Sequence, residues 1–107
     1  MLARQLELTR ATWARIRAHG VGEQAQLQLD FFFEAPSRAR ADELMRVLKQ
    51  ETDYDVRVVA DEDRWMVRGH TQPSPVTESM LEEWVDWMVT AGLQYDCRFD
   101  GWGAELP

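Results

Sequence analysis

The residues from Gln26 to Phe33 alternate polar and apolar side chains almost strictly, and no other segment constrains the fold of this chain so much. Successive side chains of a β-strand point to opposite faces of a sheet, so a sheet with one buried face produces this pattern. We therefore predict a half-buried strand whose inward residues are Leu27, Leu29, Phe31 and Phe33. With 107 residues, the chain is long enough for a single core.

Two helices are predicted after this strand. Ser37 is a suitable N-cap, and apolar residues recur at helical spacing from Ala41 to Leu48, so the first of these helices should end near Glu51. The second should begin at Ser74-Pro75, because proline is favoured at the first helical position, and should end at Gly92.

Further strands lie between and after these helices. Residues 54–60 and 65–69 alternate, and the acidic turn Asp61-Glu62-Asp63 joins them into a hairpin. Another strand should run from Gln94 to Phe99. The order β-α-β-β-α-β with right-handed crossovers predicts an α+β fold, a ferredoxin-like sandwich with two helices on one sheet face. The strands should then lie in the spatial order fourth, first, third, second.

An extra amphipathic helix precedes this unit, with a stop at His19-Gly20 and inward positions at Leu6, Thr9, Trp13 and Ile16. We divide the chain into residues 1–22, this helix and its connection, and residues 23–107, the ferredoxin-like domain. The outward sheet face should carry the apolar Phe32, Val59 and Met66, which either this helix or a second subunit could cover. Opposite charges should be neighbours on the same face, among Asp30, Arg57, Arg68, Asp96 and Arg98.

The end of the chain holds a tryptophan between two glycines, in Asp100-Gly101-Trp102-Gly103. Glycine permits a sharp turn or a positive φ, so we expect the Trp102 ring to fold back and cover one end of the core. Its main role would then be packing, with binding a secondary one.

Charge and hydropathy limit the function. The net charge is −7, with +2 on residues 1–29 and −9 on the rest. An acidic surface repels phosphate backbones, so we expect no direct nucleic acid ligand and favour a basic protein segment. No apolar run approaches the roughly 18 residues of a membrane span, and charges near the start disfavour a signal peptide. We therefore expect no membrane association and a cytoplasmic location.

Reactive side chains show no catalytic pattern. His19 and His70 have no partner at a diagnostic spacing, and Cys97 falls at an inward strand position, where a small buried hydrophobe is expected. The acidic turn lacks the alternation of a calcium loop and is better explained as a solvated turn. We predict no enzyme activity, no cofactor and no metal; an enzyme using a cleft near His70 is the weakest alternative.

Two sets of residues carry a resemblance to a known family. The first is Asp30-Phe31-Phe32-Phe33 followed by Ala35-Pro36-Ser37, and the second is Tyr95-Asp96 followed by Asp100-Gly101-Trp102-Gly103. In these, the chain resembles the bacterial RraB family of ribonuclease E regulators. The resemblance implies a non-catalytic cytoplasmic protein that binds the scaffold part of ribonuclease E and slows transcript cleavage. A self-associating interaction domain without a ribonuclease role is the alternative.

Partner contact is expected at three places. They are the acidic turn, an exposed aromatic at the margin of the helix predicted between Ser74 and Gly92, and the segment 100–103 with its glycine-flanked tryptophan. The residues are Asp61, Glu62, Asp63, Trp87, Asp100, Gly101, Trp102 and Gly103.

Overall fold

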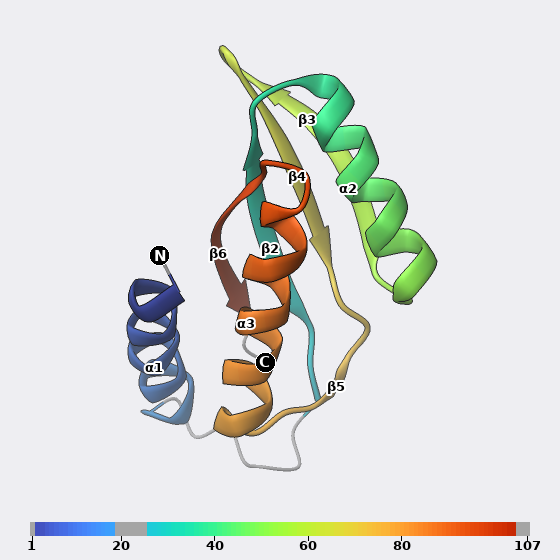
Figure 1. The fold of residues 1–107 in the computed structure, drawn as a ribbon. Coiled ribbons are helices and arrows are strands. Elements are labelled where there is room, and N and C mark those ends of the chain that lie inside the picture. The colour runs from blue at the N-terminus through green and yellow to red at the C-terminus, as the bar shows by residue number, and fades with distance from the viewer. Residues whose placement is uncertain (1, 19–25, 105–107) are drawn as a thin grey trace.

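The computed structural model of the protein describes residues 2–18 and 26–104. In this part of the chain, shown in Figure 1, the helices are α1 (Leu2–Ala18), α2 (Arg38–Glu51) and α3 (Glu78–Leu93). The main sheet consists of β2 (Leu29–Ala35), β3 (Asp55–Asp61), β4 (Arg64–His70) and β6 (Arg98–Ala104), and a short second sheet pairs β1 (Gln26–Leu27) with β5 (Ser74–Pro75). The fold is therefore α+β.

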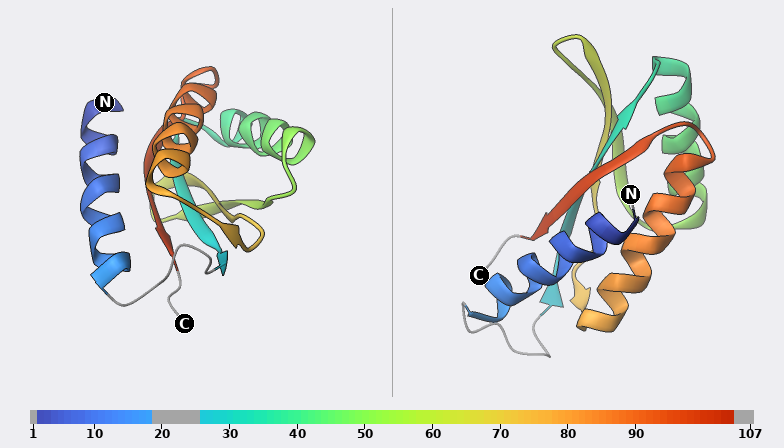
Figure 2. Two further views of the ribbon diagram at one scale, coloured as in Figure 1. Left: turned by 90° about the horizontal axis from the view of Figure 1, so that it is seen from below. Right: turned by 60° about the vertical axis from the view of Figure 1, so that its left-hand side comes forward.

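The main sheet has the strand order β3-β4-β2-β6, and each neighbouring pair is antiparallel. This is the predicted order. The predicted hairpin is also present, with Asp61 opposite Arg64 and a two-residue turn between them. Helices α2 and α3 lie on the same face of the sheet, α2 over β3 and β4, and α3 along β6 (Figures 1 and 2). The opposite sheet face, which neither helix covers, is called the open face below.

The core lies between the helices and the covered face. All four inward residues predicted for the first strand are buried, and Phe33 packs edge-on against Phe99 with ring centroids 5.2 Å apart. Ser37 caps α2 as predicted, because its side chain accepts a hydrogen bond from the Arg40 amide at 3.2 Å. Helix α2 ends at Glu51, also as predicted.

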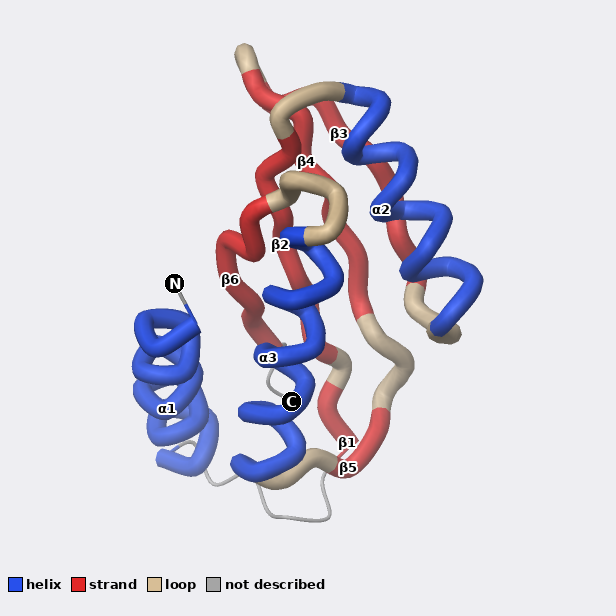
Figure 3. Tube along the Cα trace, in the orientation of Figure 1, coloured by secondary structure: helices blue, strands red, loops and turns tan. Residues whose placement is uncertain are grey.

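The first predicted strand is divided in two. Leu29 exchanges hydrogen bonds with Thr71: its amide donates to the Thr71 Oγ1 at 3.0 Å, and its carbonyl accepts from the Thr71 amide at 2.9 Å. Beyond this link, β1 pairs with β5 as a small sheet of its own (Figure 3). Ser74-Pro75 is therefore strand and not the predicted helix start. Helix α3 begins later, with Thr77 as its N-cap.

The last predicted strand is shifted along the chain. Helix α3 continues to Leu93, and the chain then reverses around Asp96, which has a φ of 59°. The Gly92 carbonyl accepts hydrogen bonds from the amides of Tyr95 and Cys97, which tightens this turn. Strand β6 therefore runs from Arg98 to Ala104 and contains the glycine-flanked tryptophan. Asp96 belongs to the turn, so its predicted place on the open face is wrong.

Helix α1 lies beside β6 and α3, as the two views of Figure 2 show. Its inner side includes the predicted positions, with Thr9 and Ile16 buried. Of the two covers considered for the open face, this helix is not one, because Gln5 donates to the Phe99 carbonyl at 3.1 Å and so anchors α1 at the β6 edge. The predicted boundary at residues 22 and 23, and the stop at His19-Gly20, fall outside the described residues.

Candidate functional site: a charged sheet face and an aromatic groove

Two of the predicted contact residues, Asp61 and Asp100, belong to the open face. A chain of ion pairs links them: Asp61 to Arg64 at 3.6 Å, Arg64 to Glu34 at 3.3 Å, Glu34 to Arg98 at 2.7 Å, and Arg98 to Asp100 at 3.5 Å. These contacts cross the whole sheet from β3 to β6. Opposite charges are therefore neighbours here, as predicted, although through a different set of residues.

One predicted charge pairing is wrong. Arg57 and Arg68 lie directly opposite each other on β3 and β4, so like charges face each other there. The Arg68 guanidinium instead lies over the Phe32 ring, 5.9 Å from its centroid, and reaches Asp61 at 3.5 Å. Met66, expected to need cover from α1 or a second subunit, is only 3% exposed. The apolar patch that motivated a second subunit on this face is thus largely covered from within the chain.

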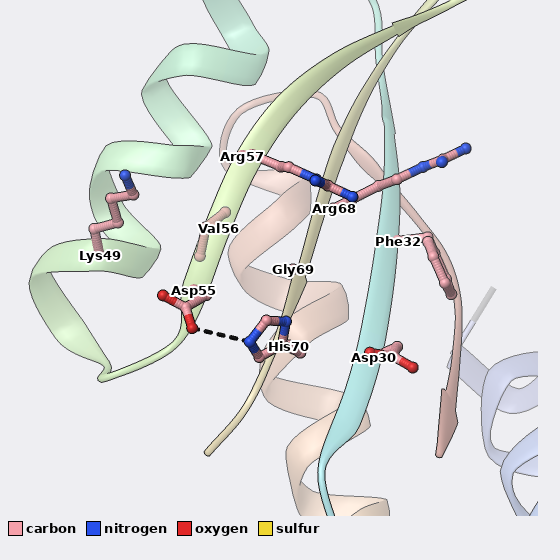
Figure 4. Close-up of a pocket in the computed structure, with 9 residues that line it drawn as sticks. All are labelled: Asp30, Phe32, Lys49, Asp55, Val56, Arg57, Arg68, Gly69 and His70. Carbon is pink, nitrogen blue, oxygen red and sulfur yellow. Dashed lines mark ion pairs between the residues drawn. The ribbon is translucent and has the colours of Figure 1, made fainter. Parts of the chain in front are cut away.

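A pocket of about 490 Å³ opens on this face next to His70, and Figure 4 shows the residues that line it. His70 Nε2 lies 2.9 Å from the Asp55 carboxylate. The lining residues bear charges of both signs and include no serine, threonine or cysteine: Asp30, Phe32, Lys49, Asp55, Val56, Arg57, Arg68, Gly69 and His70. From the part of the chain that the structure describes, the pocket therefore offers a paired histidine but no hydroxyl or thiol nucleophile beside it.

The thiol of Cys97 is held inside the fold. Cys97 is buried, as predicted, and burial together with the nearby Asp96 raises the pKa of its thiol to about 11. A neutral, enclosed thiol is a poor nucleophile. Across residues 2–18 and 26–104, no group of three or more His, Cys, Asp or Glu side chains is arranged to hold a metal ion.

The tip of the β3–β4 hairpin carries the rest of the acidic turn. Glu62 and Asp63 are exposed, and Glu62 has a positive φ of 55°, which a two-residue hairpin turn needs. Asp61, in contrast, is partly buried and paired with two arginines. Only two of the three predicted acidic residues are thus presented freely to solvent at the tip.

Trp102 is turned toward the helices by a β-bulge. Strand β2 pairs Phe33 with Phe99 and Phe32 with Gly101, so Asp100 is an extra residue on β6. Gly101 has a φ of 144°, which favours glycine. In a regular strand Trp102 would face away from Phe99, because the two residues are three positions apart; the bulge brings both side chains to the core face. The ring is folded inward as predicted, but a bulge within a strand achieves this, while Gly103 has no positive φ.

The Trp102 ring joins three elements. It packs edge-on against Trp84 of α3, with centroids 6.2 Å apart, and its Nε1 donates to the Thr9 Oγ1 of α1 at 2.9 Å. It contacts both groups of buried residues that form the core. The indole is thus occupied by the protein itself, and a role in partner contact remains a prediction.

Trp87 lies on the other side of α3, where a groove of about 550 Å³ runs between this helix and the α2–β3 connection. The groove is lined by Glu51, Thr52, Tyr54, Met80, Glu83, Trp84 and Trp87. Trp87 is 38% exposed and Met80 49% exposed. Trp84 donates its indole hydrogen to the Tyr54 hydroxyl at 3.1 Å. Burial raises the pKa of the Tyr54 phenol; the hydrogen bond from Trp84 lowers this pKa, and the charge of Asp53 raises it.

The predicted contact residues therefore do not converge on one site. Asp61 and Asp100 share the open face, Trp102 faces α1, and Trp87 faces the groove. Sequence reasoning missed the groove residues Tyr54, Glu51 and Glu83. A signal for them was present: from Glu78 to Asp86, α3 carries four acidic residues and no basic one, beside apolar residues at positions 80, 84 and 87.

Taken together, these features define a small α+β protein with a charged sheet face and an acidic, aromatic groove, and with no helix in the described residues able to cross a membrane. The chain belongs to the RraB family, described as regulator of ribonuclease activity B, which it matches over residues 6–104. This agrees with the resemblance found in the sequence. No curated protein gives a significant match.

Proposed function

We propose that this protein is a non-catalytic regulator that binds a ribonuclease E-type enzyme by protein contact and lowers its activity. The observation that carries this proposal is the family match, which spans nearly the whole chain. We further assign the sheet and its two covering helices to the ferredoxin-like class, on the strand order β3-β4-β2-β6. We place such a regulator in the cytoplasm, where transcripts are degraded.

The charge distribution supports contact with a basic protein segment. The protein has a net charge of −7, and its exposed hairpin tip adds Glu62 and Asp63 to a surface already acidic along α3. Such a surface raises association rates with a cationic partner and repels free nucleic acid. Asp61, Asp100, Gly101, Trp102 and Gly103 remain secondary contact candidates.

The test is a cleavage assay with purified full-length ribonuclease E and a labelled transcript. Adding this protein should lower the cleavage rate in proportion to the amount bound, and the two proteins should co-elute in size-exclusion chromatography. A matched assay with the isolated catalytic domain separates scaffold contact from active-site contact. The proposal would be refuted if this protein neither bound the full-length enzyme nor slowed its cleavage of the transcript.

A second candidate function is self-association without a ribonuclease role. It is favoured by two exposed leucines, Leu8 on α1 at 47% and Leu93 on α3 at 52%. Analytical ultracentrifugation over a hundredfold range of concentration tests it. A sedimentation coefficient that stays at the value of one chain throughout rules this candidate out.

A further inference from the structure

The groove beside α3 is an acidic aromatic cleft, and we propose that it binds a basic segment of the protein partner, with an arginine or lysine side chain placed against Trp87 and Trp84. This inference rests on the proposed function for the identity of the partner. The groove itself is defined by its own geometry and charge.

Two aromatic side chains of the groove, Trp84 and Tyr54, are fixed in place before any partner arrives. Trp84 is held by its hydrogen bond to the Tyr54 hydroxyl, and Phe31 packs beneath both rings, with centroids 5.6 Å from Tyr54 and 6.3 Å from Trp84. Trp87 and Met80 extend the same wall one turn to either side and remain partly exposed. A preformed aromatic surface loses little conformational entropy on binding, which favours its use as an anchor site.

The rim of the groove is acidic and unneutralised. Glu51 stands on the α2 side and Glu83 on the α3 side, and in the described part of the chain neither takes part in an ion pair. No lysine or arginine of residues 2–18 and 26–104 lines the groove. Glu82, on the neighbouring surface of α3, is by contrast paired with Arg10 at 3.3 Å.

This combination selects the occupant. A cation over the face of a tryptophan gains from the ring quadrupole, and carboxylates at the rim add charge-assisted hydrogen bonds. A purely apolar helix would leave Glu51 and Glu83 desolvated without partners, and an acidic peptide or nucleic acid would be repelled. A basic residue followed by an aliphatic one satisfies both the rim and the exposed Met80.

The first experiment uses full-length ribonuclease E and compares matched variants by equilibrium binding. Trp87→Ala should weaken binding at least about tenfold, whereas Leu93→Ala, an exposed apolar residue of α3 outside the groove, should change it less than about twofold. Glu83→Lys and Glu7→Lys change the net charge equally; Glu7 is exposed on α1 and does not line the groove, so Glu83→Lys should weaken binding about tenfold more. Equal effects within each pair overturn the inference and leave the proposed function standing.

The second experiment does not need the ribonuclease. The indole N–H signals of ¹⁵N-labelled protein are followed by NMR during titration with a synthetic amphipathic peptide of alternating arginine and leucine, and with the same peptide carrying glutamate for arginine. The basic peptide should shift the Trp84 and Trp87 signals and the acidic one should shift neither. Shifts confined to Trp13, Trp65 or Trp102, or no shift at all, overturn the inference even if ribonuclease E binds elsewhere.

Discussion

Thr9 Oγ1 accepts the indole hydrogen of Trp102 at 2.9 Å, across 93 residues of chain. The same hydroxyl donates to the Gln5 carbonyl at 2.7 Å, so the acceptor is fixed within helix α1. Thr9 is fully buried, and the bond therefore sets the position of α1 against β6 and α3.

Removing this hydrogen bond should destabilise the protein. Thr9→Val keeps the shape of the side chain and leaves the indole N–H without its acceptor, so the free energy of unfolding should fall by about 1–2 kcal/mol. Trp102→Phe should cost more, because ring volume is lost as well. In a double-mutant cycle from urea denaturation, the two changes should couple by about 1 kcal/mol; additive effects would show that the bond contributes nothing.

The β-bulge should be sensitive to Gly101 and indifferent to Gly103. A Cβ added at either position meets no atom within 4 Å, so the two sites differ chiefly in backbone conformation. At Gly101, with φ at 144°, alanine should cost about 1–2 kcal/mol, and at Gly103 less than about 0.5 kcal/mol. Thermal or urea unfolding of both variants gives the comparison. Equal losses would contradict the role assigned to the bulge.

The Cys97 thiol should resist modification and make stability pH-dependent at high pH. Its pKa of about 11 lies above the ordinary value of 9.0, so the unfolded thiol ionises first as the pH rises. The folded state then binds more protons, and the free energy of unfolding falls between these two pH values. Below pH 9 both states carry the neutral thiol and the effect is absent.

The Cys97→Ala variant isolates this contribution, since the raised pKa of Tyr54 acts equally in both proteins. The stability difference between wild type and variant should shrink from pH 8 to pH 11. Disulfide-exchange reagents at pH 8 should label the wild type only as fast as it unfolds. Immediate labelling of the folded protein would contradict the burial of the thiol.

The ion-pair chain of the open face should contribute little to stability. Glu34 contacts both Arg64 and Arg98, yet all three side chains are partly exposed, where such pairs are worth about 0–1 kcal/mol each. Glu34→Gln should therefore lower the free energy of unfolding by less than about 1.5 kcal/mol, and the loss should diminish in 1 M NaCl. Glu62→Gln at the hairpin tip is the control. A larger, salt-independent loss would mean that the network is effectively buried.

Local patterns in the sequence were sufficient for most of the fold. The sequence correctly predicts the burial of Phe31 and Phe33 and the cap at Ser37, because each depends on neighbours within a few residues. Errors arose where distant residues decide. Ser74-Pro75 pairs with β1, nearly 50 positions earlier, and this pairing removes it from the helix that its proline favours.

The candidate site was harder to predict for the same reason. Trp87 could be recognised as a marginal position of α3, but Tyr54 and Glu51 reach the groove only through the packing of α2 and β3 against that helix. Likewise, the inward turn of Trp102 depends on one unpaired residue, Asp100, whose position follows from the register between β2 and β6. Neither relationship leaves a short-range pattern in the chain.

The anchoring of α1 has a consequence for biosynthesis. This helix is made before α3 and β6, yet Gln5 binds Phe99 and Thr9 binds Trp102, both on the last described strand to be made. Most of the stability of a helix in a protein comes from its tertiary packing. The contacts of segment 2–18 with α3 and β6 can therefore form only after those later segments have been made, so this helix reaches its final place late in synthesis.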